Sequence, residues 1–256
     1  MLLNFPISSA PIFMPHYFVE PSQITGDHFT LTGDEAHHLL RVLRVKRGDQ
    51  IDLFDGTGRQ FRVVIDRLGE HTIEGSVLSH KTASAAAAKV HLVCSVPKGD
   101  RFDWLVEKCC EIGVAAITPL ITARSSTSDI SEAKLERWRR LSLAASKQCG
   151  RPALMPIRPC LPFADAIKTL TPETIALLPW EGEEAASIEK YPIHSGSEVT
   201  LFIGPEGGFT LQEIELARSS KILPVTLGRS ILRVETAALV ASVLALGKAG
   251  QFNHAA

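Results

Sequence analysis

The chain lacks the features that mark several large classes of protein. No apolar run reaches the roughly 18 residues that a membrane-spanning helix needs, so we expect no membrane partner. The net charge is only −1, so binding to nucleic acid requires a local basic patch. No C-x-x-C pair occurs among the five cysteines, which we expect to be reduced core residues of a cytoplasmic protein. They are Cys94, Cys109, Cys110, Cys149 and Cys160.

Motifs of the common hydrolases, metal sites and nucleotide-binding enzymes are also missing. The sequence holds no G-x-S-x-G, no H-E-x-x-H and no EF-hand loop, so we predict no metal site. Neither a Walker A loop nor a complete G-x-G-x-x-G fingerprint is present, which disfavours ATP and NAD as ligands. Residues 1–13 carry no basic residue, so we expect no secretory signal there.

The first third of the chain alternates short strand patterns with turn signals. These patterns predict a small β-barrel or sheet, with a hairpin turn at Asp55-Gly56-Thr57-Gly58. A short helix is expected at 34–45, with Leu39, Val42 and Leu43 on one face.

A change of composition follows at residues 81–88, which are small and low in complexity. We interpret this stretch as a domain boundary. The predicted division is an extension at 1–15, a β domain at 16–82 and a second domain at 89–256.

From residue 90 onward, strand patterns alternate with helix patterns. The apolar runs predict buried strands at 90–96, 114–121, 174–179, 199–203 and 222–227. Helices are expected after Asp100, at 132–148, after the capping box Thr210-Leu211-Gln212-Glu213, and at 234–246. This alternation predicts an open α/β sheet, whose ligands bind at the carboxyl ends of the strands.

Two glycine-rich turns fall at such strand ends, at 203–210 and 227–237. Glycine permits positive φ and lets backbone groups approach a ligand closely. Glu206 lies inside the first turn and would repel a phosphate, so a neutral or cationic ligand fits better. The plain alternative is a tight connection without a ligand.

Charged residues flank the second turn. An arginine at the start of a helix, such as Arg233, opposes the helix dipole and indicates a role other than helix stability. The alternative is a surface ion pair between Arg233 and Glu235, which contributes under about 1 kcal/mol.

Two basic clusters could contact RNA phosphates. One follows the helix from Lys134 to Arg151, whose apolar face is Leu135, Trp138, Leu141 and Ala145. The other is His37, His38, Arg41, Arg44, Lys46 and Arg47. Both patterns are also typical of solvated helix faces.

Taken together, these motifs resemble the RsmE family of 16S ribosomal RNA (uracil-N3) methyltransferases, within the SPOUT superfamily. The resemblance covers about residues 16–250. It rests on His38-Leu39-Leu40-Arg41-Val42-Leu43-Arg44, Lys98-Gly99-Asp100-Arg101, Glu107-Lys108, Glu111-Ile112-Gly113-Val114, Arg124-Ser125, Glu136-Arg137-Trp138, Gln148 with Gly150-Arg151, Gly204–Thr210 and Leu227–Ala237. The family usually has threonine where this chain has Val234, and residues 1–13 match nothing in the family.

The resemblance implies an α/β fold: a SPOUT-type domain with a deep trefoil knot, plus an N-terminal PUA-like β-barrel that grips ribosomal RNA. It also implies a homodimer, S-adenosylmethionine as cofactor, and one uridine of the small ribosomal subunit as substrate. The implied cofactor-binding residues are Leu178, Pro179, Gly204, Pro205, Glu206, Gly207, Gly208, Leu227, Gly228, Ser230, Ile231, Leu232 and Thr236. The expected RNA-binding residues are Arg41, Arg44, Arg124, Arg137, Arg140, Gln148 and Arg151.

Methylation of uracil N3 requires loss of the N3 proton and stabilisation of anionic character on the ring. Arg233 is the candidate for holding charge on a carbonyl oxygen, and either Glu206 or Glu235 could take the proton. Two other functions stay open. One is ribose 2′-O methylation of RNA on the same fold, and the other is a non-catalytic RNA-binding protein of ribosome assembly.

Overall fold

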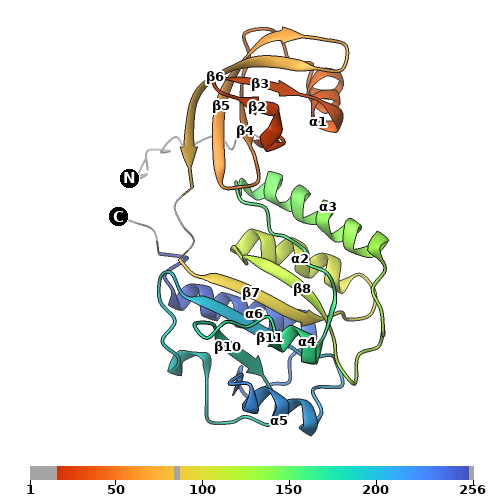
Figure 1. The fold of residues 1–256 in the computed structure, drawn as a ribbon, viewed down its shortest axis with the longest axis vertical. Coiled ribbons are helices and arrows are strands. Elements are labelled where there is room, and N and C mark those ends of the chain that lie inside the picture. The colour runs from red at the N-terminus through yellow and green to blue at the C-terminus, as the bar shows by residue number, and fades with distance from the viewer. Residues whose placement is uncertain (1–15, 84–86, 254–256) are drawn as a thin grey trace, which may run out of the picture. The chain divides into compact units, whose positions relative to one another are not determined.

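The computed structural model describes residues 16–83 and 87–253, which form two compact units (Figure 1). The first unit contains the described residues up to Ala83 together with Lys147–Ala153, and the second contains the rest. The expected extension at 1–15 lies outside the described residues.

The first unit is built on a six-stranded sheet in the order β1-β4-β5-β6-β3-β2. Its strands are β1 (His16–Phe18), β2 (Ile24–Thr25), β3 (His28–Leu31), β4 (Gln50–Phe54), β5 (Arg59–Leu68) and β6 (Ile73–Thr82). Among the described strands of this sheet, β1 and β4 pair in parallel and the other pairs are antiparallel. Buried Phe61, Val63 and Ile65 alternate with more exposed neighbours along β5, as in a sheet with one face on the core.

The helix expected at 34–45 is irregular. A short η1 (Pro21–Gln23) lies earlier in the unit, and α1 (Gly33–His37) runs directly into a π-helix, η2 (His38–Leu43). Leu39 is fully buried, but Val42 is 63% exposed and Leu43 is 46% exposed. The prediction that these three residues share one face is therefore wrong, because i→i+5 hydrogen bonding adds a residue to the turn and rotates the later side chains outward.

The second unit contains a parallel sheet in the order β12-β10-β11-β7-β8-β9. Its strands are β7 (Lys89–Ser95), β8 (Ala116–Ile121), β9 (Leu161–Pro162), β10 (Ile175–Pro179), β11 (Glu198–Ile203) and β12 (Leu223–Val225). Nearly every residue of β7 and β11 is buried, as expected for strands covered on both faces. The open α/β sheet expected from the alternating pattern is confirmed.

Helices cover both faces of this sheet (Figure 1). They are α2 (Arg101–Ile112), α3 (Glu132–Cys149), α4 (Phe163–Ile167), α5 (Leu211–Ser219) and α6 (Val234–Lys248), with a short η3 (Ile188–Lys190). α6 packs on β7, β11 and α2, whereas α4 and α5 pack on each other and on other strands. Trp138 of α3 packs against Phe102 of α2, with ring centroids 4.3 Å apart and the ring planes tilted by 48°. In the described part of the chain, no helix is long and apolar enough to cross a membrane.

The capping predictions differ in outcome. Asp100 occupies the N-cap of α2 as expected, but its side chain makes no capping hydrogen bond. The capping box of α5 is confirmed, because the Glu213 backbone N–H donates to Thr210 Oγ1 at 3.2 Å while the Glu213 carboxylate accepts from the Thr210 backbone N–H at 2.8 Å.

Glu213 also ties two loops together at the carboxyl edge of the sheet. Its second carboxylate oxygen accepts from the Ala123 backbone N–H at 2.8 Å, so the loop after β8 is held against the start of α5. The next residue, Arg124, donates to the carbonyl oxygen of Gly207 at 2.8 Å. These two contacts fix the glycine-rich turn after β11.

Replacing Glu213 with alanine should lower the free energy of unfolding by about 1–2 kcal/mol. The substitution removes a helix cap and leaves the Ala123 N–H without its acceptor. Urea denaturation followed by circular dichroism measures the loss. Glu215→Ala is the matched control, since Glu215 is exposed on the same helix and should change stability by less than about 0.5 kcal/mol. Equal losses in the two variants would contradict this role of Glu213.

Candidate active site at the carboxyl edge of the parallel sheet

The loops that follow four neighbouring strands gather at one edge of the second unit. β10, β11, β7 and β12 all run parallel, so their carboxyl ends point the same way. The segment after β10, the glycine-rich turn after β11 and the turn after β12 therefore converge, as the sequence predicts for the two glycine-rich turns.

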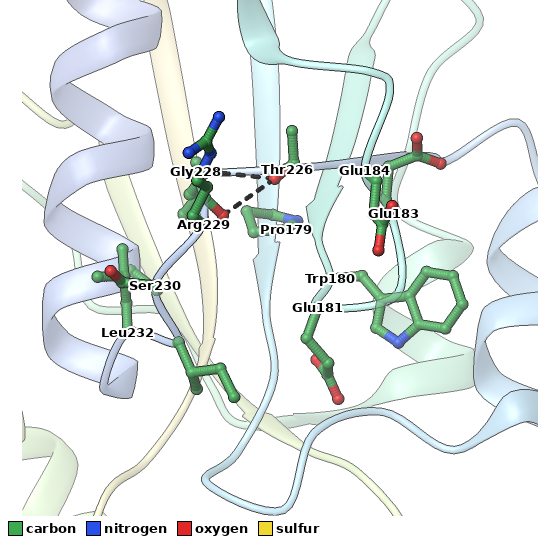
Figure 2. A pocket seen from close by; sticks show the side chains of 13 residues that line it. Pro179, Trp180, Glu181, Glu183, Glu184, Thr226, Gly228, Arg229, Ser230 and Leu232 are labelled. Atoms are coloured by element: carbon green, nitrogen blue, oxygen red, sulfur yellow. Dashed lines mark hydrogen bonds between the residues drawn. The ribbon is translucent and has the colours of Figure 1, made fainter.

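A hollow of about 530 Å³ lies between the segments after β10 and β12. Figure 2 shows Trp180 to Glu184 on one side of it and Gly228 to Leu232 on the other. Its lining consists of Pro179, Trp180, Glu181, Glu183, Glu184, Thr226, Leu227, Gly228, Arg229, Ser230, Ile231, Leu232 and Ala237. This volume is in the range of pockets that hold a small organic ligand.

Six of the expected cofactor residues line the hollow: Pro179, Leu227, Gly228, Ser230, Ile231 and Leu232. The others do not, and they are Leu178, Gly204, Pro205, Glu206, Gly207, Gly208 and Thr236. The side chain of Leu178 is fully buried in the core, because alternate residues of β10 face opposite sides of the sheet.

The glycine-rich turn after β11 contacts Glu181, which lines the hollow. A Cβ atom on Gly208 would lie 2.6 Å from Glu181 Oε1, so the absence of a side chain there allows Glu181 to take its place in the lining. Gly208 also has a φ of +68°, which glycine adopts without strain.

Trp180, which the sequence interpretation expected in the cofactor-binding turn Leu178-Pro179-Trp180, is the largest residue that lines the hollow. Its backbone N–H donates to the Val225 carbonyl at 3.0 Å, which joins the ends of β10 and β12. The Arg218 guanidinium lies 5.8 Å from its ring centroid. A Cβ atom on Gly182 would come within 2.4 Å of the ring. The sequence interpretation did not assign Glu181 to the site, and its place directly after Trp180 at a strand end was the available signal.

Three carboxylates stand on the same wall: Glu181, Glu183 and Glu184. Glu183 accepts from the backbone N–H groups of Ala185 and Ala186, both at 2.9 Å, and these hydrogen bonds hold its pKa below the ordinary value. Glu183 is thus engaged in its own loop, while the concentration of negative charge favours a cationic ligand.

A second polar group lies at the starts of α2 and α6. Arg101 stands between two carboxylates, with Nη1 3.8 Å from Glu206 Oε1 and Nε 3.8 Å from Glu235 Oε1. The structure therefore brings together the two candidate proton acceptors. The sequence analysis gave Arg101 no role, although an arginine in the first turn of a helix opposes the dipole and was a signal of the kind that singled out Arg233.

The two glutamates differ in access. The side chain of Glu206 is 42% exposed and that of Glu235 is 12% exposed. Among the described residues, Glu235 Oε2 is buried without a hydrogen-bond partner. Burial, with Cys109, Glu235 and Glu206 nearby, holds the pKa of the Cys94 thiol well above its ordinary value. Cys94 is therefore protonated and unsuited to nucleophilic chemistry.

Arg233 is the N-cap residue of α6, and it is exposed. It does not line the hollow, and among the described residues no ion pair joins it to Glu235, which faces Arg101 instead. The interpretation of Arg233 and Glu235 as a plain surface pair is thus not supported.

The expected RNA-binding residues occupy varied environments. Arg124 is engaged with Gly207, and Arg137 forms an ion pair with Asp103. Arg151 is partly buried. The remaining four are exposed: Arg41, Arg44, Arg140 and Gln148. Within the two described ranges, no cluster of three or more histidine, cysteine, aspartate or glutamate residues is arranged to hold a metal.

Comparison with known proteins agrees with this arrangement. The family model of an RNA methyltransferase domain matches residues 84–246, and that of an RNA methyltransferase PUA domain matches residues 31–78. The N-terminal sheet is therefore a PUA-like domain, and the parallel sheet is the core of an α/β methyltransferase fold.

Curated relatives carry the name ribosomal RNA small subunit methyltransferase E. The protein of that name from Synechocystis sp. is 34% identical over 247 residues, which cover 94% of this chain and 81% of the relative. The one from Bacillus subtilis is 28% identical, with 89% of this chain and 94% of the relative covered.

Solved structures show the same likeness. Ribosomal RNA small subunit methyltransferase E from Neisseria gonorrhoeae, bound to S-adenosyl methionine, is 31% identical with a TM-score of 0.80, and the match covers 90% of this chain and 96% of that one. A methyltransferase from Legionella pneumophila in complex with SAM is 29% identical with a TM-score of 0.79, over 91% and 97% of the two chains. The chain described here therefore belongs to the ribosomal RNA small subunit methyltransferase E family, which confirms the resemblance to RsmE.

Proposed function

We propose that this protein transfers a methyl group from S-adenosylmethionine to N3 of one uridine in 16S ribosomal RNA. The observation that carries the proposal is the hollow at the ends of β10 and β12, in a chain whose solved relatives hold that cofactor. A ribosomal RNA substrate supports a cytoplasmic localisation, which belongs to the same proposal.

The residues of the hollow fit the cofactor. Leu227, Ile231 and Leu232 supply apolar surface for a flat aromatic base, and glycine at 228, with a φ of +112°, exposes backbone groups. Glu181 and Glu184 bring negative charge to the same cavity, which suits a positively charged ligand. When bound, S-adenosylmethionine supplies an electrophilic methyl group on a sulfonium.

Arg101, Glu206 and Glu235 form a polar group that can take up the proton released from uracil N3. The uracil N3 proton must leave before the nitrogen can act as a nucleophile, so a carboxylate has to accept it. We assign this role to Glu206, because its side chain is accessible to an incoming base while Glu235 is mostly enclosed. Glu235 then positions Arg101, and exposed Arg233 is the candidate for holding charge on a uracil carbonyl.

We further propose that the chain forms the deep trefoil knot of the SPOUT superfamily. The contacts after β12 support this. Thr226 donates from its backbone N–H to the carbonyl of Ala186 at 2.7 Å, and α6 packs on η3 as well as on β7 and β11. The segment that leads into α6 therefore runs against the connection between β10 and β11.

The reaction predicts a single methyl mark at uracil N3. Small ribosomal subunits from a strain without this protein, incubated with the protein and S-adenosylmethionine, should gain that mark at one uridine, located by nuclease digestion and mass spectrometry. A mark on a ribose 2′-oxygen would favour the alternative reaction, and no mark together with no cofactor binding would favour an assembly protein. Glu206→Gln should lower kcat by about 10²–10⁴-fold, whereas Glu215→Gln serves as an inert control.

If the hollow binds the cofactor, alanine substitutions at two glycines of positive φ should have different effects on cofactor affinity. Gly208→Ala should push Glu181 into the cavity and weaken S-adenosylmethionine binding about tenfold. Gly196→Ala imposes a similar backbone strain, at a φ of +84° with nothing within 4 Å of the added Cβ, and should leave the affinity unchanged. Isothermal titration calorimetry measures both. Equal affinities of the two variants for S-adenosylmethionine would contradict a role for Glu181 and Gly208 in the cofactor site.

Exposed apolar residues on α2 and α6 support a homodimer. Trp104 is 43% exposed, Val243 38% and Leu244 37%, and the two helices pack on each other. A Val243→Asp/Leu244→Asp variant should sediment as a monomer, because an unpaired charge in an apolar interface is costly. Leu216→Asp on α5, where Leu216 is 41% exposed, should keep the wild-type mass. A monomeric wild-type protein would contradict the dimer.

A further inference from the structure

The segment from His38 to Arg44 has an irregular backbone. The π-helix η2 spans His38–Leu43, and π-helical turns occur frequently at functional sites. Arg44 ends it with φ 54° and ψ 45°, a left-handed conformation usually taken by glycine or asparagine at this position. A non-glycine residue there costs free energy, and such residues cluster where function retains the strain.

The irregular turn places two large apolar side chains in solvent. Leu39 is fully buried, and Leu40 and Val45 pack against the same core. In a regular α-helix Leu43 would share that buried face, because it follows Leu39 by four residues. It is instead 46% exposed, next to Val42 at 63%. We call Val42 and Leu43 the apolar tip.

Exposed cations flank the apolar tip on both sides along the chain. They are Arg41, Arg44, Lys46 and Arg47, and within the described residues none of these four forms an ion pair with a carboxylate. Two acidic groups close to this segment in the sequence are engaged: Glu35 pairs with Lys147, and Asp49 accepts from the backbone N–H of Lys46 at 2.7 Å. The surface is therefore apolar at its centre and positively charged at its rim.

We propose that the apolar tip packs against an unstacked base of the ribosomal RNA, while Arg41 and Arg44 hold the phosphates on either side. This inference rests on the proposed function and specifies how the PUA-like domain binds the substrate. RNA matches the charge of the rim, and its unpaired bases offer flat faces to apolar side chains. Apolar side chains flanked by arginines and lysines likewise wedge between base steps in other nucleic-acid complexes. The domain thus selects a single-stranded or splayed region rather than a regular duplex.

The test separates apolar contact from charge. A Val42→Ser/Leu43→Ser variant should bind unmodified small ribosomal subunits about tenfold more weakly at every salt concentration, with an unchanged slope of log affinity against log salt. Arg41→Ala should instead reduce that slope by about one. Leu78→Ser is the matched control, since Leu78 is 50% exposed on β6 of the same sheet and should bind as the wild type does.

A photoreactive residue identifies the occupant of the surface. Val42→p-benzoylphenylalanine should crosslink to ribosomal RNA in the small subunit, at an unpaired nucleotide. A crosslink to a ribosomal protein or to a second copy of this chain, or wild-type binding by the double serine variant, would overturn the proposal. These readouts do not depend on catalysis. If the N3 methyl mark is missing while the crosslink to RNA is intact, the proposed reaction is contradicted and the proposed RNA contact of the apolar tip is not.

Strain at Arg44 supplies a further readout. Arg44→Gly should raise the melting temperature, because glycine adopts the left-handed conformation freely, while binding to the subunit weakens. A variant that loses both stability and binding would show that Arg44 acts in the fold rather than at the RNA.

Discussion

Parallel pairing of β10, β11, β7 and β12 is the constraint on which the second unit depends. It brings the ends of strands that are distant in sequence to one edge, so that Trp180, Gly204 and Thr226 begin neighbouring loops. The register is strict because the strands are buried on both faces, and a slip by one residue would exchange every core side chain for its neighbour. The hollow and the charged group beside it both follow from this pairing.

The loops at the carboxyl edge of the parallel sheet are held together mainly through backbone atoms, so the side chains of Glu206, Glu235 and Arg101 are not used for this purpose. Glu213 and Arg124 bind backbone atoms of the adjacent loops, and Trp180 joins β10 to β12 through its own backbone. Glu206 and Glu235 are then left to face Arg101. The negative charge along the hollow and the single arginine between two carboxylates are arranged in a way that suits a cationic cofactor and a proton acceptor.

The first unit departs from a regular helix at the segment from His38 to Arg44, and the same segment carries the exposed Arg41 and Arg44. The π-helix turns Leu43 out of the core and ends at a strained arginine. Burying Leu43 in a regular helix would gain apolar burial. A segment that forgoes this gain indicates a surface kept for binding, because departures from regular structure concentrate at functional sites.

The sequence by itself determined the alternation of the main strands and helices of the second unit, the parallel sheet, the capping box at Thr210 and the two glycine-rich turns, because periodicity, caps and glycine act over a few residues. Its separate motifs, in their order along the chain, also identified the family. Only the tertiary structure decided that Glu181 lines the hollow, that Arg101 links Glu206 with Glu235, and that Val42 and Leu43 point outward. These facts depend on strand order and on a change in helical hydrogen bonding, which are set by packing between distant segments and leave no local pattern of residues.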